Sequence, residues 1–141
     1  MTIQQHTRRT QLSALLSDMV MRVPHADKGI VVSSDGMLLA LSPGLDRASG
    51  DRLAAVASSL MGIATGASGP LRGGPVDEVV VQMRNSLCLV TRISEEASVA
   101  VVASPRCDLA ELAYEMELFA NQTGPLVGRA LQSELQAQLP Q

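Results

Sequence analysis

Aromatic side chains are almost absent from the sequence, which contains one Tyr, one Phe and no Trp among its 141 residues. This scarcity excludes a groove for single-stranded nucleic acid, because such grooves stack successive bases on aromatic rings. Positive charge is scarce as well, since 11 Lys and Arg face 14 Asp and Glu and the net charge is −3. Proteins that bind nucleic-acid phosphates present a basic face, so we expect no nucleic-acid partner.

Long apolar segments are missing too. No run approaches the roughly 18 residues that cross a bilayer, and we expect no membrane partner. Arg8 and Arg9 resemble the start of a twin-arginine export signal, but charged side chains interrupt the segment that follows, residues 11–23. An amphipathic helix is the better interpretation of that segment, and we therefore expect a cytoplasmic protein.

Sequence motifs for catalysis or cofactor binding are also lacking. There is no Gly-x-x-x-x-Gly-Lys-Ser/Thr loop for a nucleotide phosphate, and His6 and His25 have no neighbours that suggest a catalytic triad. Two cysteines and two histidines without paired spacing do not form a zinc site. The adjacent carboxylates of Asp77 and Glu78 would point to opposite faces of a strand. We therefore predict no catalytic residue, no cofactor and no metal site, and expect that the protein is not an enzyme.

Both cysteines have a simple structural interpretation. Cys88 lies within a predicted strand, where a buried and inert thiol is expected. Cys107 directly precedes a predicted helix, whose dipole can lower the pKa of a thiol, so a redox role is the alternative at that position. Two cysteines are too few for a disulfide framework.

Length and a hydrophobic content of 46% indicate one domain spanning residues 1–141. Helical spacing of apolar residues predicts helices over residues 7–23, from 46–51 to 67, and from 108 onward. Short apolar or β-branched runs predict strands at residues 28–33, 37–42, 76–83, 87–93 and 98–104. Residues 1–6 are expected to be disordered. Residues 125–141 extend the last helix, which either bends at Pro125 or breaks there into two helices.

Turn chemistry indicates how the strands pair. Asp35-Gly36 favours the positive φ angles of a tight hairpin, so the first two strands should be antiparallel neighbours. The last three strands are joined by connections too short for a parallel crossover, which predicts an antiparallel meander. The resulting element order is α-β-β-α-β-β-β-α, an α/β fold of the α+β type.

A row of small residues marks the second helix. Ala54, Ser58, Gly62 and Gly66 repeat every four residues and carry almost no side-chain bulk. Such a row lets another backbone approach closely, either a second helix or the protein's own sheet. Gly62 lowers helix stability by roughly 1 kcal/mol relative to Ala, so a close contact should compensate for it.

Three segments, in this order, resemble the roadblock / dynein light-chain family. The likeness is to its bacterial, gliding-motility GTPase-regulator-like branch, which is encoded beside small GTPases. Residues 29–42 (GIVVSSDGMLLALS) are similar to the family's first hairpin, and residues 51–68 (DRLAAVASSLMGIATGAS) to its central helix. Residues 113–136 (AYEMELFANQTGPLVGRALQSELQ) are similar to the long C-terminal helix of the bacterial members. The resemblance implies a five-stranded antiparallel sheet flanked by helices.

The same resemblance implies a homodimer, in which two central helices pack on each other and the third strands pair between subunits. Carried onto this sequence, the pairing helix is residues 51–67 and the pairing strand is residues 76–83. These assignments favour a second helix as the neighbour of the small row. The expected interface residues are Ala54, Ser58, Leu60, Met61, Gly62, Gly66, Val76, Glu78 and Val80.

The function that the resemblance implies is that of a non-enzymatic regulator or adaptor. Its dimer would bind a Ras-like small GTPase and modulate the nucleotide state of that GTPase. Arg72, Arg84 and Arg92 are interpreted as surface residues, because the family's regulators are expected to reposition the GTPase's own catalytic groups rather than supply an arginine. The alternative is a pure scaffold that links sensor-kinase-like or motor-associated proteins without affecting GTP turnover.

Overall fold

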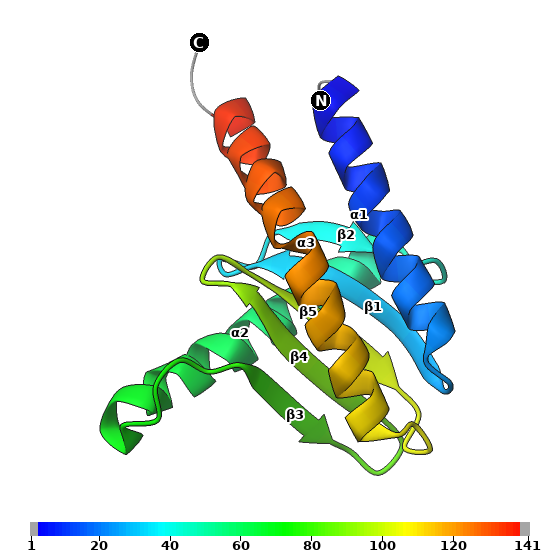
Figure 1. Cartoon of the computed structure of the whole chain (residues 1–141), viewed down its shortest axis with the longest axis vertical. Coiled ribbons are helices and arrows are strands. Elements are labelled where there is room, and N and C mark those ends of the chain that lie inside the picture. The colour runs from blue at the N-terminus through cyan, green and yellow to red at the C-terminus, as the bar shows by residue number, and fades with distance from the viewer. Residues whose placement is uncertain (1–2, 139–141) are drawn as a thin grey trace.

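The structure is a computed structural model that describes the backbone of residues 3–138, and the side chains in that range except those of residues 5, 130 and 132–138. Three helices and five strands follow one another in the predicted order (Figure 1). They are α1 (Ile3–Arg22), β1 (Ala26–Ser33), β2 (Leu38–Leu41), α2 (Arg47–Leu71), β3 (Glu78–Gln82), β4 (Leu87–Ser94), β5 (Ala97–Ala103) and α3 (Leu109–Gln138).

The five strands form one antiparallel sheet in the order β2-β1-β5-β4-β3. The predicted hairpin and the predicted meander are both present, and pairing of β1 with β5 joins them into one sheet. At the hairpin turn Gly36 has a φ of +91°, and its N–H donates to the Ser33 carbonyl at 3.0 Å. Glycine adopts this left-handed conformation without steric cost, which explains its place in the turn. The two edge strands are β2 and β3.

Helices cover the two faces of the sheet unequally. α1 and α3 lie side by side on one face, whereas α2 alone lies on the other (Figure 1). The larger apolar core fills the space under α1 and α3, and includes Leu12, Leu16, Met19, Leu89, Leu112, Met116 and Phe119. A smaller core under α2 joins Ala54 and Ala57 to Ile30, Val32 and Val90 of the sheet. One helix therefore covers only part of its sheet face.

The first helix begins earlier than the sequence predicts. Residues 3–6 were expected to be disordered, but α1 is helical from Ile3, and the hydroxyls of Thr7 and Thr10 donate to the carbonyls of Ile3 and His6. Near its other end, Arg22 forms an ion pair of 3.2 Å with Glu115 of α3. Residues 1–2 lie outside the described residues.

The last helix is continuous from Leu109 to Gln138, with Pro125 inside it. It does not break into two helices, which was the alternative. Two residues before the proline, the buried Thr123 hydroxyl donates to the Phe119 carbonyl at 2.7 Å. Threonine hydroxyls commonly form this bond to the preceding turn of a helix. Residues 139–141, the end of the expected helical extension, are outside the described range.

Aspartate side chains cap the N-terminal ends of α2 and α3. Asp46 accepts from the Ser49 N–H at 2.7 Å, and these hydrogen bonds hold the pKa of the Asp46 carboxyl below its ordinary value. Asp108 accepts from the Glu111 N–H at 3.2 Å, as its predicted capping role requires. At its other end, α2 extends four residues beyond the expected end and closes at Arg72, which has a left-handed φ of 54°.

Candidate protein interface

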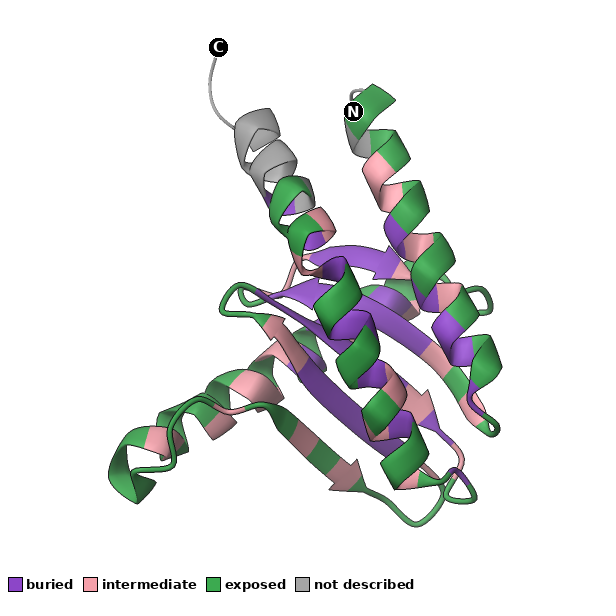
Figure 2. Cartoon of the chain, in the orientation of Figure 1, coloured by how far each residue is buried: buried purple, intermediate pink, exposed green. Residues whose placement is uncertain are grey.

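The helix α2 carries three large apolar side chains that are exposed. Val56 is 53% exposed, Ile63 is 75% exposed and Leu71 is 77% exposed. Figure 2 shows that the far half of this helix, which projects past the sheet, has no buried residue. Exposed apolar side chains grouped on one element are typical of a surface that binds another protein.

The predicted row of small residues turns out to cross the helix rather than follow one face. Ala54 is fully buried against the chain's own sheet, Ser58 is half-buried, and Gly62 and Gly66 are exposed. A step of four residues advances slightly more than one turn of about 3.6 residues, so the row winds from the inner to the outer face. Ala54 therefore cannot reach a partner, which corrects its assignment to an outward-facing row.

A different set of small residues forms a straight exposed ridge on α2. Its spacing alternates between four and three residues, which keeps a row on one face of a helix. All five members are exposed, and they are Ala55, Ser59, Gly62, Gly66 and Gly69. A Cβ added at any of the three glycines meets no atom within 4 Å. We call this set the α2 ridge, and a second backbone can approach closely along it.

The other predicted helix residues face inward. Leu60 and Met61 are half-buried and pack on the smaller core, together with Val79 and Val81 of β3. Both residues lie on α2, as predicted, and a single chain buries their side chains only partly. They lie between α2 and the strand at the edge of the sheet, not on the outer surface of the helix.

The open edge of the sheet lies at β3. Asp77 accepts from the Arg92 N–H at 2.9 Å and Met83 donates to the Ser86 carbonyl at 2.8 Å, so the odd-numbered residues of β3 bond to β4. Because antiparallel pairs alternate, the backbone groups of Glu78, Val80 and Gln82 face outward, away from β4. Their side chains are exposed and lie on the face of α3, since Val80 pairs with Leu89 of the larger core.

Val76 does not belong to this strand. The predicted strand of residues 76–83 is shortened to Glu78–Gln82, and Val76 lies half-buried in the connection that precedes it. Gly74, with a φ of +76°, and Pro75 come directly before it. A proline has no N–H for pairing, which explains why the strand begins later than its β-branched composition suggests.

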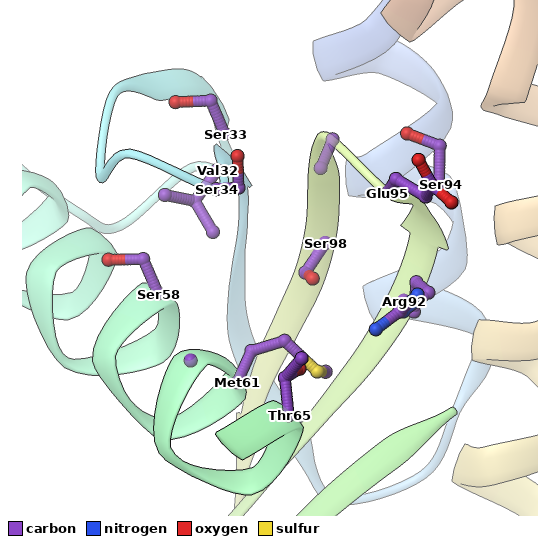
Figure 3. A pocket seen from close by; sticks show the side chains of 12 residues that line it. Val32, Ser33, Ser34, Ser58, Met61, Thr65, Arg92, Ser94, Glu95 and Ser98 are labelled. Atoms are coloured by element: carbon purple, nitrogen blue, oxygen red, sulfur yellow. The ribbon is translucent and has the colours of Figure 1, made fainter. Parts of the chain in front are cut away.

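A shallow hollow of about 210 Å³ lies between α2 and the sheet. Three of the expected interface residues, Ser58, Met61 and Gly62, line it. Figure 3 shows Met61 and Thr65 of the helix on one side of the hollow, and Ser98 and Arg92 of the strands on the other. Serine and threonine residues make up half of the lining, which also includes Arg92 and Glu95.

An acidic cleft of about 450 Å³ lies on the opposite face, between α3 and the start of β3. Three acidic residues and one basic residue line it, together with Asn121, and they are Asp77, Glu78, Glu117 and Arg92. No ion pair neutralises these carboxylates within residues 3–138. Thr91, which is 7% exposed and sits opposite Glu78, lines the same cleft. We call these residues the acidic cleft.

The hydroxyl of Thr91 has an unusual environment in this cleft. It is buried and has no hydrogen-bond partner among the described residues. Leaving such a group unpaired costs about 1–3 kcal/mol relative to a bonded one. An unpaired buried hydroxyl is unusual in any fold, and here it belongs to the residue that lies opposite Glu78 in the pairing of β3 with β4.

The thiols show no sign of redox activation. Burial raises the pKa of Cys88, and burial followed by the carboxylates of Glu111 and Asp108 raises the pKa of Cys107. The raised pKa of Cys107 favours an inert thiol there over the alternative of a redox role. His6 and His25 are both exposed. Among the described residues, no group of three or more potential metal ligands is present, and no helix is both long and apolar enough to cross a membrane.

Comparison with known proteins places these features in a family. The model of the Roadblock/LC7 domain matches residues 12–103. A Roadblock/LC7 domain from Streptomyces avermitilis is 34% identical, with a TM-score of 0.78, covering 82% of this chain and 96% of that chain. No curated protein sequence gives a significant match.

Two MglB structures share the fold at low identity. MglB of Myxococcus xanthus is 11% identical with a TM-score of 0.76, covering 86% of this chain and 91% of that chain. An MglB in a tetrameric arrangement is 16% identical with a TM-score of 0.77, covering 87% of this chain and 92% of that chain. The family match spans all five strands and α2, and the identity to the Streptomyces domain exceeds what fold alone requires. The chain therefore belongs to the Roadblock/LC7 family.

Proposed function

We propose that this protein is a non-enzymatic homodimer that binds a Ras-like small GTPase and modulates its nucleotide state. The observation that carries the dimer is the open side of the molecule, where the α2 ridge and the outward-facing backbone of β3 lie next to each other. Within the described part of a single chain, no second backbone packs on the α2 ridge, and no strand pairs with the outward backbone groups of β3. Each feature can pair with its own copy across a twofold axis. The choice of a Ras-like GTPase as the partner is based on the resemblance to the regulators of gliding motility.

Pairing of two β3 strands explains why this edge is left open. An uncovered edge strand presents free N–H and C=O groups and is an aggregation hazard. A second β3, related by a twofold axis, would satisfy these groups at Glu78, Val80 and Gln82. The antiparallel register that pairs all five residues places the axis at Val80, with Glu78 opposite the partner's Gln82.

The α2 ridge supports the same arrangement. When the β3 strands pair, the smaller cores of both chains meet at the axis, and Val79 and Val81 are covered further. The two α2 helices then lie on the same face of a continuous ten-stranded sheet. Small residues at their crossing allow close approach, which compensates for the helix stability lost at Gly62 and Gly66.

A dimer of this kind can act on a GTPase without catalysing a reaction. A binding protein shifts the equilibrium between two states of its partner only through its different affinities for the two states. Among the described residues, neither the hollow beside α2 nor the acidic cleft holds a group of three or more residues that could ligate a metal ion. Modulation by binding is therefore the mechanism that we propose.

The experiment combines the purified protein with a Ras-like GTPase encoded beside it. Affinity is measured for the GDP-bound and the GTP-bound forms, and hydrolysis is followed by phosphate release with and without the protein. We expect tighter binding to one nucleotide state, with or without a faster rate. Equal affinity for both states together with an unchanged rate would refute regulation and would leave the scaffold as the better account.

A further inference from the structure

We propose that Arg84 of one chain enters the acidic cleft of a second copy of the same chain and pairs with Glu78 there. This inference rests on the proposed dimer and specifies which charged contact fixes its register. It starts from two groups that the single chain leaves without a partner. Arg84 is exposed and makes no ion pair within the described range, and the same is true of the carboxylates in the cleft.

The position of Arg84 follows from the turn that joins β3 to β4. The bond from the Met83 N–H to the Ser86 carbonyl closes a turn whose two central residues are Arg84 and Asn85. Arg84 therefore projects from the tip of the hairpin, two residues beyond the last residue of β3. Arg84 follows Gln82 by two residues, and the side chain of Gln82 lies on the face of α3.

Strand geometry brings this tip to the cleft of the other chain. When the axis passes through Val80, Gln82 of one chain lies opposite Glu78 of the other, and Arg84 lies two residues further along. Strands are about 4.8 Å apart and advance about 3.4 Å per residue, so the Cα atoms of Arg84 and the other chain's Glu78 lie about 8 Å apart. An extended arginine side chain reaches across that distance.

The chemistry of the cleft suits a guanidinium group. A planar guanidinium offers five N–H donors and pairs well with carboxylates. Glu78 and Glu117 line the cleft, and Asp77 lies next to Glu78 in the chain. A guanidinium that pairs with Glu78 reduces the excess of negative charge in this cleft.

Charge-reversal variants test this contact. Glu78→Arg and Arg84→Glu are each prepared alone, and dimer dissociation is measured by sedimentation. Each variant alone places like charges together twice per dimer, and we expect its dissociation constant to rise about tenfold. The double variant keeps the net charge of the natural chain and restores opposite charges at both contacts. We expect it to dissociate at close to the original concentration.

Mixing the two single variants shows whether the contact runs between chains. A dimer of one Glu78→Arg chain with one Arg84→Glu chain has opposite charges at both contacts, whereas each homodimer has none. Native mass spectrometry should therefore find mixed dimers well above their statistical share. A statistical distribution, or a double variant as weak as the single ones, would overturn the assignment of Arg84.

The outcomes separate this inference from the proposed function. If the natural chain sediments as a monomer at all concentrations, the homodimer itself is wrong. If the natural chain is a dimer but charge reversal changes nothing, the homodimer stands and Arg84 does not enter the cleft. Asp18→Arg, exposed on α1 and outside both proposed contact surfaces, is the control for a reversed carboxylate and should leave dissociation unchanged.

Discussion

Replacing Gly62 by leucine tests the role of the α2 ridge. In one chain the glycine is exposed, and an added Cβ meets no atom within 4 Å, so leucine fits without strain. Leucine is a better helix former than glycine by about 0.8–1 kcal/mol. We therefore expect Gly62→Leu to raise the free energy of unfolding of the separate chain by about that amount.

The same variant should weaken the dimer. Overpacking a closely packed contact costs about 1–3 kcal/mol, and a twofold axis imposes the cost twice. The total of about 2–6 kcal/mol corresponds to a rise of at least about thirtyfold in the dissociation constant. Stability and association would thus change in opposite directions, which a general loss of folding does not produce.

The assay needs two measurements and one control. Sedimentation from nanomolar to micromolar concentration gives the dissociation constant, and thermal unfolding at the lowest concentration gives the stability of the separate chain. Gly128→Leu is the matched control, because Gly128 is also an exposed helical glycine with no atom within 4 Å of an added Cβ. If both leucine variants associate like the natural chain, the α2 ridge is not an interface.

Three further predictions concern single side chains. Thr91→Val removes an unpaired buried hydroxyl and should raise the free energy of unfolding of the separate chain by about 1 kcal/mol, measured by denaturant unfolding at low concentration; a decrease would contradict the absence of a partner. Hydrogen bonds from Ser49 lower the pKa of Asp46 in the folded state, so its contribution to stability is complete above the ordinary value of 3.8 and is lost as the pH falls below it. Asp46→Asn keeps a capping side chain and should remove that part of the acid dependence, and unchanged acid unfolding would argue against the cap. Cys107, whose pKa is raised, should react with iodoacetamide more slowly than a free thiol at pH 7.5, as followed by mass spectrometry, and fast labelling would contradict its burial.

Much of the fold follows from local sequence signals. The hairpin at Asp35-Gly36, the meander of the last three strands and the capping role of Asp108 all follow from residues within a few positions of each other. Such signals depend on turn chemistry and spacing, which a single sequence contains. The central position of β5 beside β1 is different, because no local pattern distinguishes it from the other strands.

Features that depend on the exact helical phase were harder to predict. A four-residue repeat suggests one face of α2, but the helix places Ala54 inside and Gly66 outside. The members of the α2 ridge, such as Ala55 and Ser59, can be found in the sequence as residues whose spacing alternates between four and three. Val76 was assigned to the strand on composition, although the preceding Gly74-Pro75 favours a later start.

The acidic cleft lay beyond sequence reasoning for a different reason. Glu78, Thr91 and Glu117 belong to three elements, and only the register of β3 with β4 and the position of α3 bring them together. The sequence also gives no sign that the Thr91 hydroxyl lacks a partner. Long-range packing decides both points.

The α2 ridge, the edge of β3 and the charged pair of Glu78 and Arg84 all come from one uninterrupted stretch of chain, residues 47–84. The helices on the opposite face contribute mainly to the hydrophobic core, and Glu117 of α3 borders the acidic cleft. Discrimination between an identical chain and a paralogue can therefore evolve, or be engineered, by exchanging this cassette alone while the rest of the domain is conserved. Several such domains in one genome can each form only their own dimers if their sequences differ within this stretch, about a quarter of the chain.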